Sequence, residues 1–436
     1  MSAIAWIALS SLAAWGWLSL GQGFFWRTDQ RLPTPASPGP SVLPGPSVLP
    51  GAAVPPGSSV LPGAAALPNA PGTAGPAGGD EGTWPSVAVV VPARDEADML
   101  PESLPSLLAQ VYPGAAEIYL VDDGSTDGTG ELARDLAVRY GGLPLTVSSP
   151  GEPEPGWTGK LWALRHGIAL ARGGPKDPEY LLLTDADIAH EPDSLRELVA
   201  AALGHRLDLV SQMARLRVAS GWEKLVVPAF VYFFAQLYPF RWINRPGART
   251  AAAAGGCVLL RTEAAVRAGV PESIRQAVID DVSLAKAVRD SGGRLWLGLA
   301  ERVDSIRPYP RLGDLWRMVA RSAYAQLRHN PLLLLGTVAG LAVIYLAPPA
   351  ALCAGLFGGD TAAGWLGFAA WAVMAGTYLP MLRYYRQSSW LAPLLPFTAF
   401  LYLLMTVDSA VQHYRGRGAA WKGRTYARPG SEPRPQ

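Results

Sequence analysis

The chain has 436 residues, of which 49% are hydrophobic and only 17% charged, and its mean hydropathy is +0.15. Soluble domains carry about 25% charged residues, so this composition argues against a wholly soluble protein. The net charge of +2 lacks the basic excess of a nucleic-acid-binding surface, and we expect no nucleic acid partner. Cys257 and Cys353 lie far apart in the sequence and predict neither a disulfide framework nor a thiolate metal site.

Residues 1–26 contain no charged side chain and are followed by Arg27 and Arg31. A helix of this length reaches roughly 35–40 Å, which is enough to cross a bilayer. The chain start lacks the positive charge that opens a signal peptide. The segment therefore predicts a retained N-terminal transmembrane anchor whose Arg27 end faces the cytoplasm.

Residues 33–83 contain no Lys or Arg, and the phrase Ser-Val-Leu-Pro-Gly occurs in them three times. Proline at this density removes the backbone donors that helices and strands need. The segment predicts a disordered Pro/Ala/Gly-rich linker, for which a spacer role is favoured over a binding role. From residue 84 to 330 the composition becomes that of a soluble domain.

Short β-branched runs alternate with helical patterns between residues 84 and 300. This order predicts a mostly parallel, doubly wound α/β sheet, in which ligands bind at the carboxyl ends of the strands. Strands are expected at 86–91, 117–121, 145–148, 180–184 and 208–211, and helices at about 97–110, 127–140, 158–172 and 193–203.

Acidic clusters follow three of the expected strands. They read Pro92-Ala-Arg-Asp-Glu96, Asp122-Asp-Gly-Ser and Asp185-Ala-Asp187. Carboxylates crowded at one sheet edge would become protonated unless a counter-charge is present. Mg²⁺ and Mn²⁺ are held in proteins by one or two carboxylates together with substrate phosphate oxygens. The clusters therefore predict a divalent cation and a nucleotide at this edge.

Five phrases in a fixed order carry a family resemblance. They are Val-Pro-Ala-Arg-Asp-Glu, Val-Asp-Asp-Gly-Ser-Thr-Asp-Gly-Thr, Gly159-Lys160, Thr-Asp-Ala-Asp and Ile-Asp-Asp-Val-Ser-Leu. This series, over about 86–330, resembles the inverting family 2 glycosyltransferases, which implies a GT-A doubly wound mixed sheet. The layout of anchor, catalytic domain and membrane helices is similar to the bacterial hopene-associated glycosyltransferases. Supporting phrases are Pro155-Gly-Trp-Thr-Gly-Lys160, Ala254-Gly-Gly-Cys257 and Trp421-Lys-Gly-Arg-Thr-Tyr426.

The resemblance implies a nucleotide-diphosphate-sugar donor and assigns residues to it. Pro92, Arg94 and Glu96 would line the nucleoside pocket, and Asp122 or Asp123 would accept hydrogen bonds from the base or ribose. Lys160 would meet the diphosphate as a point charge. Asp187 would hold Mg²⁺ or Mn²⁺, with Asp185 on the ribose or the metal.

An inverting transfer also needs a base for the acceptor hydroxyl. In the family phrase Asp/Glu-Asp-x-x-Leu the base is the second acid. Here the phrase is Asp280-Asp281-Val-Ser-Leu284, so Asp281 is the predicted base and Asp280 is expected to position the acceptor or backbone. Gly255 and Gly256 would let the chain approach the sugar or acceptor closely; a tight turn is the alternative.

Processive members of the family carry Gln-x-x-Arg-Trp. The nearest alignment here is Met318-Val-Ala-Arg321-Ser322, which lacks the Gln and the Trp. Arg321 is still expected to reach the diphosphate. The departure favours transfer of a single sugar over polymer synthesis.

Three uncharged segments, 331–359, 361–382 and 387–407, predict a C-terminal transmembrane region over 331–410, followed by a basic tail over 411–436. Three crossings would place this tail outside, whereas basic residues favour the cytoplasmic side. One segment is therefore expected to be interfacial or re-entrant, with a break at Pro348-Pro349 or at Pro393/Pro396.

The stretch 222–242 is rich in aromatic residues and has Lys224, Arg241 and Arg245 at its ends. This pattern predicts a membrane-interface segment, with a core-packing helix as the alternative. Pro228 and Pro239 are expected to prevent one straight helix.

These features predict a multi-pass protein of the bacterial inner membrane with a cytoplasmic catalytic domain. We expect a metal-dependent inverting glycosyltransferase that moves one sugar to a lipid hydroxyl, with a hopanoid as the leading acceptor. Polyprenyl phosphate and carotenoid acceptors are alternatives. Two alternatives come from other classes: a non-catalytic nucleotide-binding membrane scaffold and a sugar nucleotidyltransferase. A nucleotidyltransferase needs a glycine-rich basic loop after the first strand, and residues 92–96 do not form such a loop.

Overall fold

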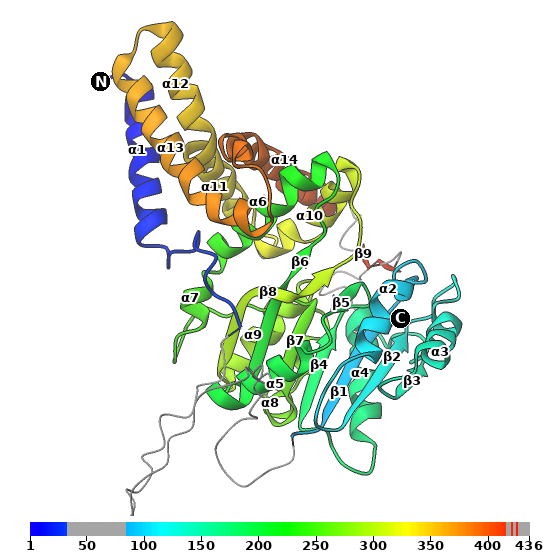
Figure 1. Cartoon of the computed structure of the whole chain (residues 1–436). Helices are drawn as coiled ribbons and strands as arrows, with labels where there is room; N and C mark the ends of the chain where they lie inside the picture. Colours follow the sequence, from blue (N-terminus) through cyan, green and yellow to red (C-terminus); the bar gives the residue numbers. More distant parts are fainter. Residues whose placement is uncertain (33–83, 416–419, 422–423, 426–436) are drawn as a thin grey trace, which may run out of the picture.

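The computed structural model describes residues 1–32, 84–415, 420–421 and 424–425 (Figure 1). The linker predicted over 33–83 and most of the predicted basic tail lie outside the described residues. An eight-stranded mixed sheet in the order β3-β2-β1-β4-β7-β6-β8-β5 forms the centre. Its strands are β1 (Val87–Ala93), β2 (Ala116–Asp122), β3 (Leu145–Ser148), β4 (Tyr180–Thr184), β5 (Ile188–His190), β6 (Leu209–Leu216), β7 (Cys257–Arg261) and β8 (Leu295–Ser305). A short antiparallel pair, β9 (Ala420–Trp421) and β10 (Arg424–Thr425), lies near the chain end.

The predicted doubly wound mixed sheet is confirmed. Strands β1 to β4 pair in parallel, and β7 runs antiparallel between β4 and β6. Strand β8, which the sequence pattern did not reveal, pairs in parallel with β6 and antiparallel with β5. Because β1, β2 and β4 run in one direction, their carboxyl ends and the acidic segments after them share one edge of the sheet.

Side-chain alternation in β1 separates two cores. Val87, Val89 and Val91 pack against the helices of one face, and Ala88 and Val90 pack against those of the other. The first face carries α2 (Leu100–Leu108), α3 (Thr129–Tyr140) and α5 (Ser194–His205), and the second carries α4 (Gly159–Arg172), α6 (Gly221–Leu237), α8 (Thr262–Arg267), the 3₁₀ turn η1 (Glu272–Ile274) and α9 (Asp280–Asp290). The second core continues into the apolar helices beyond the sheet.

Helix α6 covers most of the aromatic stretch. It begins at a capping box between Ser220 and Glu223 and ends before Pro239, after which α7 (Phe240–Ile243) follows. The helix continues through Pro228 and ends before Pro239, so the stretch is not one straight helix, as predicted. Val231 and Tyr232 are buried, so packing on both sides holds the helix together despite the proline. Its centre is thus a core-packing helix, the alternative that the sequence left open.

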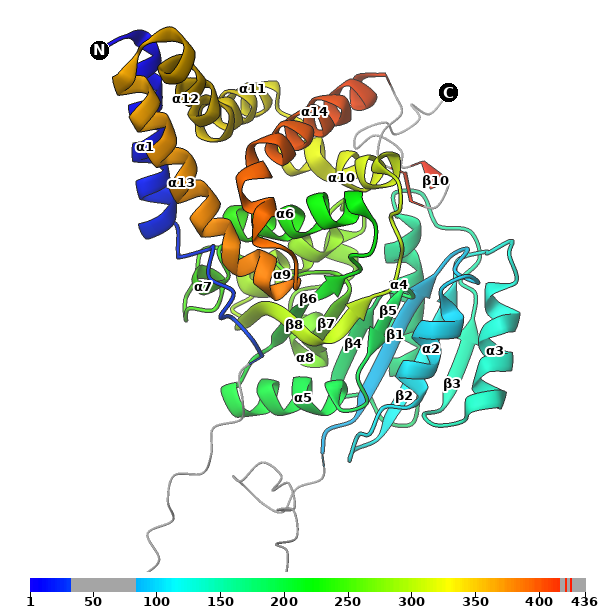
Figure 2. The same ribbon diagram turned by 45° about the horizontal axis from the view of Figure 1, so that its top comes forward.

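The remaining helices form a layer and a column above the sheet. They are α1 (Ala3–Leu20), α10 (Leu312–Gln326), α11 (Pro331–Leu341), the π-helical turn η2 (Ala342–Leu346), α12 (Ala347–Gly358), α13 (Thr361–Tyr384), the 3₁₀ turn η3 (Ser389–Leu394) and α14 (Leu395–Tyr414). In the described ranges, four helical segments are long and apolar enough to cross a membrane: Ala3–Leu20, Pro331–Gly358, Thr361–Tyr384 and Ser389–Tyr414. Helices α1, α12 and α13 pack side by side in a column, whereas α14 packs along α10 near the sheet (Figures 1 and 2).

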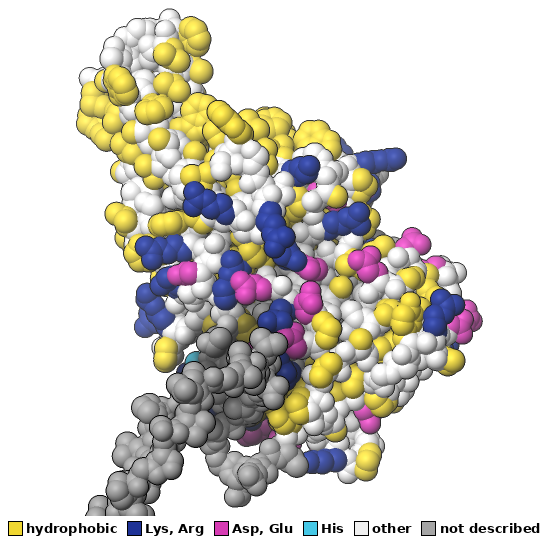
Figure 3. All heavy atoms as spheres, viewed as in Figure 1, with side chains coloured by type: hydrophobic (Ala, Val, Ile, Leu, Met, Phe, Trp, Pro, Cys, Tyr) yellow, Lys and Arg dark blue, Asp and Glu magenta, His cyan; other side chains and the backbone are white. Residues whose placement is uncertain are grey.

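One contact shows which helix ends lie together at the far end of this column. The Ser2 hydroxyl donates a hydrogen bond to the Asp360 carboxylate, so the start of α1 and the turn between α12 and α13 lie at the same far end. Arg27 and Arg383 lie at the opposite ends of α1 and α13, towards the sheet. Figure 3 shows hydrophobic side chains over the column and a concentration of Lys and Arg at its base.

Candidate functional site

A cavity of about 870 Å³ opens at the edge of the sheet where β1 and β4 end, and it continues to α10 and α14. It gathers side chains from segments that lie far apart in the sequence. The predicted site residues that line it are Pro92, Glu96, Lys160, Asp185, Asp187, Gly255, Gly256, Asp280, Asp281 and Arg321.

Lys160 lies between two carboxylates in this cavity. Thr158 caps the N-terminus of α4 and so places Lys160 in the first turn of the helix. The Lys160 Nζ lies 2.8 Å from Asp185 Oδ1 and 3.0 Å from Asp280 Oδ2. Burial would lower the pKa of Lys160, but the charges of Asp185 and Asp280 outweigh it and raise that pKa. Lys160 is therefore a fixed positive charge.

The same contacts separate the pKa values of the two acids. Burial, reinforced by the charge of Asp187, raises the pKa of Asp185 despite its contact with Lys160. Burial also acts on Asp280, yet the Lys160 charge prevails and lowers the pKa of Asp280. Asp280 is thus the more firmly ionised partner of Lys160.

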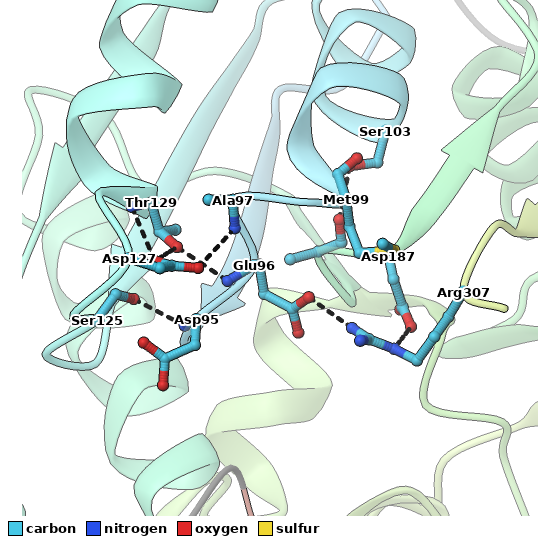
Figure 4. A network of polar contacts seen from close by, with 11 residues as sticks. Asp95, Glu96, Ala97, Met99, Ser103, Ser125, Asp127, Thr129, Asp187 and Arg307 are labelled. Carbon is cyan, nitrogen blue, oxygen red and sulfur yellow. Dashed lines mark hydrogen bonds and ion pairs between the residues drawn. The ribbon is translucent and has the colours of Figure 1, made fainter. Parts of the chain in front are cut away.

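Arg307 makes a second bridge at this edge, which the sequence did not predict (Figure 4). Its Nε lies 2.6 Å from Asp187 Oδ2, and its Nη2 lies 2.5 Å from Glu96 Oε2. Burial would lower the pKa of Arg307, but Asp187 and Glu96 raise it. Arg307 lies two residues beyond the end of β8, so only recognition of that strand and its pairing could have placed it at this edge.

Backbone contacts fix the two acids that Arg307 joins. The Asp187 carbonyl accepts from the Ile306 amide at 3.0 Å, which attaches the end of β8 to this turn. The Glu96 amide donates to Thr129 Oγ1 at 2.9 Å, and Asp127, at the start of α3, accepts from the Ala97 amide at 2.9 Å (Figure 4). The loops after β1 and β4 are therefore held independently of Arg307.

Asp281 occupies the first turn of α9 and lines the same cavity as Glu96. Its Oδ2 accepts from the Gly255 amide at 3.0 Å, and its Oδ1 accepts from the Val282 amide at 2.7 Å. Burial and the charge of Asp280 raise the pKa of Asp281 to about 6. This carboxylate is still ionised at neutral pH, yet it is a stronger base than an ordinary aspartate.

The two glycines before β7 differ in how much space surrounds them. A Cβ at Gly256 would lie 3.0 Å from Ile188 Cδ1, and the Gly256 carbonyl accepts from the Thr184 hydroxyl at 2.8 Å. A Cβ at Gly255 would meet the nearest atom, Lys160 Nζ, only at 3.5 Å. A larger residue would therefore be more crowded at position 256, where it meets Ile188 of β5, than at position 255.

Three predicted donor residues, Arg94, Asp122 and Asp123, are not among those that line the cavity. Arg94 donates to the Asp123 carbonyl, and its Nη1 lies 3.6 Å from the fully buried Asp123 carboxylate. Asp122 Oδ1 accepts from the Ser125 amide at 2.8 Å, and a Cβ at Gly130 would lie 2.8 Å from its other oxygen. In this structure these side chains shape the loops after β1 and β2.

The far end of the cavity lies between α10 and α14. Tyr324, His329, Gln412 and His413 line it, and the His329 and His413 rings are stacked with centroids 4.2 Å apart. The cavity thus joins the acidic edge of the sheet to an apolar helix.

The donor set suits a divalent cation that arrives with phosphates. Within the described ranges, no group of three or more His, Cys, Asp or Glu side chains is arranged to hold a metal ion. Asp187 and Asp185 supply the carboxylate oxygens that Mg²⁺ and Mn²⁺ prefer, and such ions need only one or two of them when substrate phosphates complete the shell. The residues present therefore fit this role.

Comparisons with known proteins agree with this geometry. Residues 88–266 match the family described as Glycosyl transferase family 2, and the mixed sheet with its helices has the GT-A fold. Glycosyltransferase AglE of Haloferax volcanii is 30% identical over 129 residues, 29% of this chain and 39% of that protein. An undecaprenyl-phosphate 4-deoxy-4-formamido-L-arabinose transferase of Aeromonas hydrophila is 32% identical over 144 residues, 32% of this chain and 40% of that protein. The chain thus spans about two fifths of the length of these relatives.

Among solved structures, the mannosyltransferase PcManGT from Pyrobaculum calidifontis, in complex with GDP-Man and Mn²⁺, is 21% identical with a TM-score of 0.48. That similarity covers 76% of this chain and 88% of PcManGT.

Proposed function

We propose that this domain transfers a single sugar, with inversion, from a nucleotide-diphosphate-sugar to a lipid hydroxyl at the cytoplasmic face of the bacterial inner membrane. One observation carries the proposal. The cavity that holds Lys160 and the paired acids at the sheet edge also contains Asp281 and extends to α14. Donor, base and lipid acceptor would thus share one cavity.

On the donor side, Pro92 and Glu96 would line the nucleoside pocket, and Arg94, Asp122 and Asp123 would set the shape of its loops. Lys160 and Arg321 would bind the diphosphate. Asp187, with Asp185, would hold Mg²⁺ or Mn²⁺, which when bound supplies positive charge to the departing nucleoside diphosphate. Gly255 and Asp280 would position the acceptor and Asp281.

Asp281 would act as the general base. Its carboxylate takes the proton from the acceptor hydroxyl as the hydroxyl oxygen bonds to the anomeric carbon and the bond from that carbon to the diphosphate oxygen breaks. The burial that raises its pKa strengthens it for this task. Asp280 stays ionised beside Lys160 and so keeps the proton from being shared between the adjacent acids.

The helix arrangement supports a membrane topology in which the basic tail and the sheet domain would lie on the same side. We propose that α1, the continuous α11–α12 segment and α13 cross the bilayer, while α14 lies at the interface along α10. The Ser2–Asp360 contact would then lie outside, and both the sheet domain and the basic tail inside, as the positive-inside rule requires.

A hopanoid is the leading acceptor through the resemblance of the motifs. Polyprenyl phosphate is the second candidate, favoured by the relative named as an undecaprenyl-phosphate transferase. Mass spectrometry of lipid extracts, with and without the protein and after supply of labelled sugar nucleotides, would separate the two. A labelled lipid must appear with wild type; its absence with every donor would favour a non-catalytic nucleotide-binding scaffold.

A further inference from the structure

Arg307 takes the position of a counter-cation at the acidic edge. Its guanidinium lies within 2.6 Å of one oxygen of Asp187 and 2.5 Å of one oxygen of Glu96, and its side chain is 24% exposed, towards the cavity (Figure 4). Glu96 is itself 6% exposed. Charged hydrogen bonds of this kind, partly removed from water, are among the stronger polar contacts in a protein.

A divalent cation would compete with the Arg307 guanidinium for the Asp187 carboxylate. A metal bound to Asp187 would place two positive charges beside Arg307, and like charges at contact distance repel strongly where water is partly excluded. The Arg307 contact must therefore weaken before Asp187 can accept a metal. A metal ion alone offers Arg307 no replacement partner.

The backbone around Arg307 is held in place, so the side chain is the part that can move. The Ile306 amide is bonded to the Asp187 carbonyl at 3.0 Å. The Tyr309 amide donates to the buried Glu223 carboxylate at 2.6 Å, and that carboxylate also accepts from the Ser220 amide at 2.7 Å. With its chain fixed on both sides, the guanidinium can turn from Asp187 into the cavity without a shift of β8 or α10.

A diphosphate in the cavity would supply the missing partner. Guanidinium groups bind phosphate oxygens in two-point contacts that an ammonium cannot reproduce. We infer that Arg307 blocks a free divalent cation from Asp187 and moves to the donor diphosphate when metal and nucleotide enter together. This inference rests on the proposed function. It makes metal and nucleotide binding mutually dependent, with Arg307 as the coupling residue.

The test measures Mn²⁺ binding by the full chain in detergent, by the loss of the free Mn²⁺ electron paramagnetic resonance signal, with and without UDP or GDP. Wild type should bind Mn²⁺ weakly alone and at least about tenfold more tightly with the matching nucleotide. Arg307→Ala should bind Mn²⁺ alone about 10-fold or more tighter than wild type, the factor expected for loss of one charged hydrogen bond. In this variant the nucleotide should add correspondingly less.

Arg302→Ala is the matched control, because it removes a guanidinium near the end of β8, five residues before Arg307, whose partner is Asp193, at 2.6 Å, and which does not line the cavity. It should leave both Mn²⁺ affinities unchanged. Arg307→Lys should retain part of the block, since an ammonium keeps the charge but not the two-point contact.

Equal Mn²⁺ affinity of wild type and Arg307→Ala without nucleotide would overturn the inference, as would an unchanged nucleotide effect in the variant. The proposed function would survive both results, because nucleotide-dependent Mn²⁺ binding would still be seen. If wild type binds neither UDP nor GDP, with or without Mn²⁺, the proposed donor site itself fails.

Discussion

The backbone amide of Gly255 donates a hydrogen bond to the Asp281 carboxylate at 3.0 Å, and this contact joins the approach to β7 to the first turn of α9. The hydrogen bond fixes the orientation of the Asp281 side chain. It also stabilises the charged form of the carboxylate, which burial disfavours. The carboxylate keeps an acceptor geometry set by the backbone, while its pKa rises to about 6. These properties suit a base, and they can be tested separately.

Asp281→Asn is expected to lower kcat by at least about 10²-fold, since the amide has the shape of the carboxylate but cannot take a proton. Binding of UDP or GDP, measured by calorimetry, should stay within about twofold of wild type. Asp290→Asn, at the exposed end of the same helix beside Arg289, is the control and should be fully active. Turnover retained by Asp281→Asn would remove Asp281 as the base.

The pH dependence should follow the ionisation of the same group. Below about pH 6 the Asp281 carboxylate binds a proton and loses its function, so kcat/KM should fall about tenfold per pH unit as the pH decreases. Above this value the rate should level off. The residual rate of Asp281→Asn should show no such step, and a wild-type profile that is flat between pH 5 and 8 would contradict the assignment.

Lys160→Met should leave Asp185 and Asp280 without the cation between them. We expect nucleotide diphosphate binding to weaken at least tenfold, and the free energy of unfolding to fall by about 2 kcal/mol, less than for a fully buried pair because both acids are partly exposed. Adding Asp280→Asn should restore part of the stability but not the binding.

Arg165→Met is the control for this change. Arg165 lies on the same helix, its ion pairs are with the exposed acids Glu154 and Glu272, at 3.8 and 3.4 Å, and a Met side chain can keep its contact with the Trp157 and Trp162 rings. Surface pairs of this kind contribute little, so stability and binding should both remain close to wild type. Equal losses in both variants would show that α4, rather than the Lys160 charge, was disturbed.

Gln412→Trp should fill the end of the cavity between α10 and α14. If a lipid acceptor enters there, its apparent KM should rise several-fold while donor binding stays unchanged. Val411→Trp provides the control, because Val411 is its neighbour on α14, is 38% exposed and does not line the cavity. An unchanged acceptor KM in Gln412→Trp would place the lipid path elsewhere.

The sequence predicted the acidic edge because Asp187 and its neighbours follow strands that alternate with helices. That alternation alone indicates that the strands are parallel and that their ends share one edge. It missed Arg307, whose position depends on β8 crossing to pair with both β6 and β5. The sequence predicts Asp122 or Asp123 on the donor, but it could not predict the hydrogen bond that Asp122 accepts from the Ser125 amide, which depends on the exact course of one loop. Strand ends could be read from local patterns, but long-range pairing and loop geometry could not.

Helix α1 is bound to its neighbours by more than apolar contact. At the π-helical turn η2, the Ile344 carbonyl accepts from Trp15 Nε1 at 2.8 Å and from the Ser11 hydroxyl at 3.3 Å. If this segment were replaced by a generic hydrophobic helix, the Ile344 carbonyl would lose both of these donors, at a free-energy cost. Removal of residues 1–26 is therefore expected to disturb the packing of the helices around η2, in addition to removing one apolar helix.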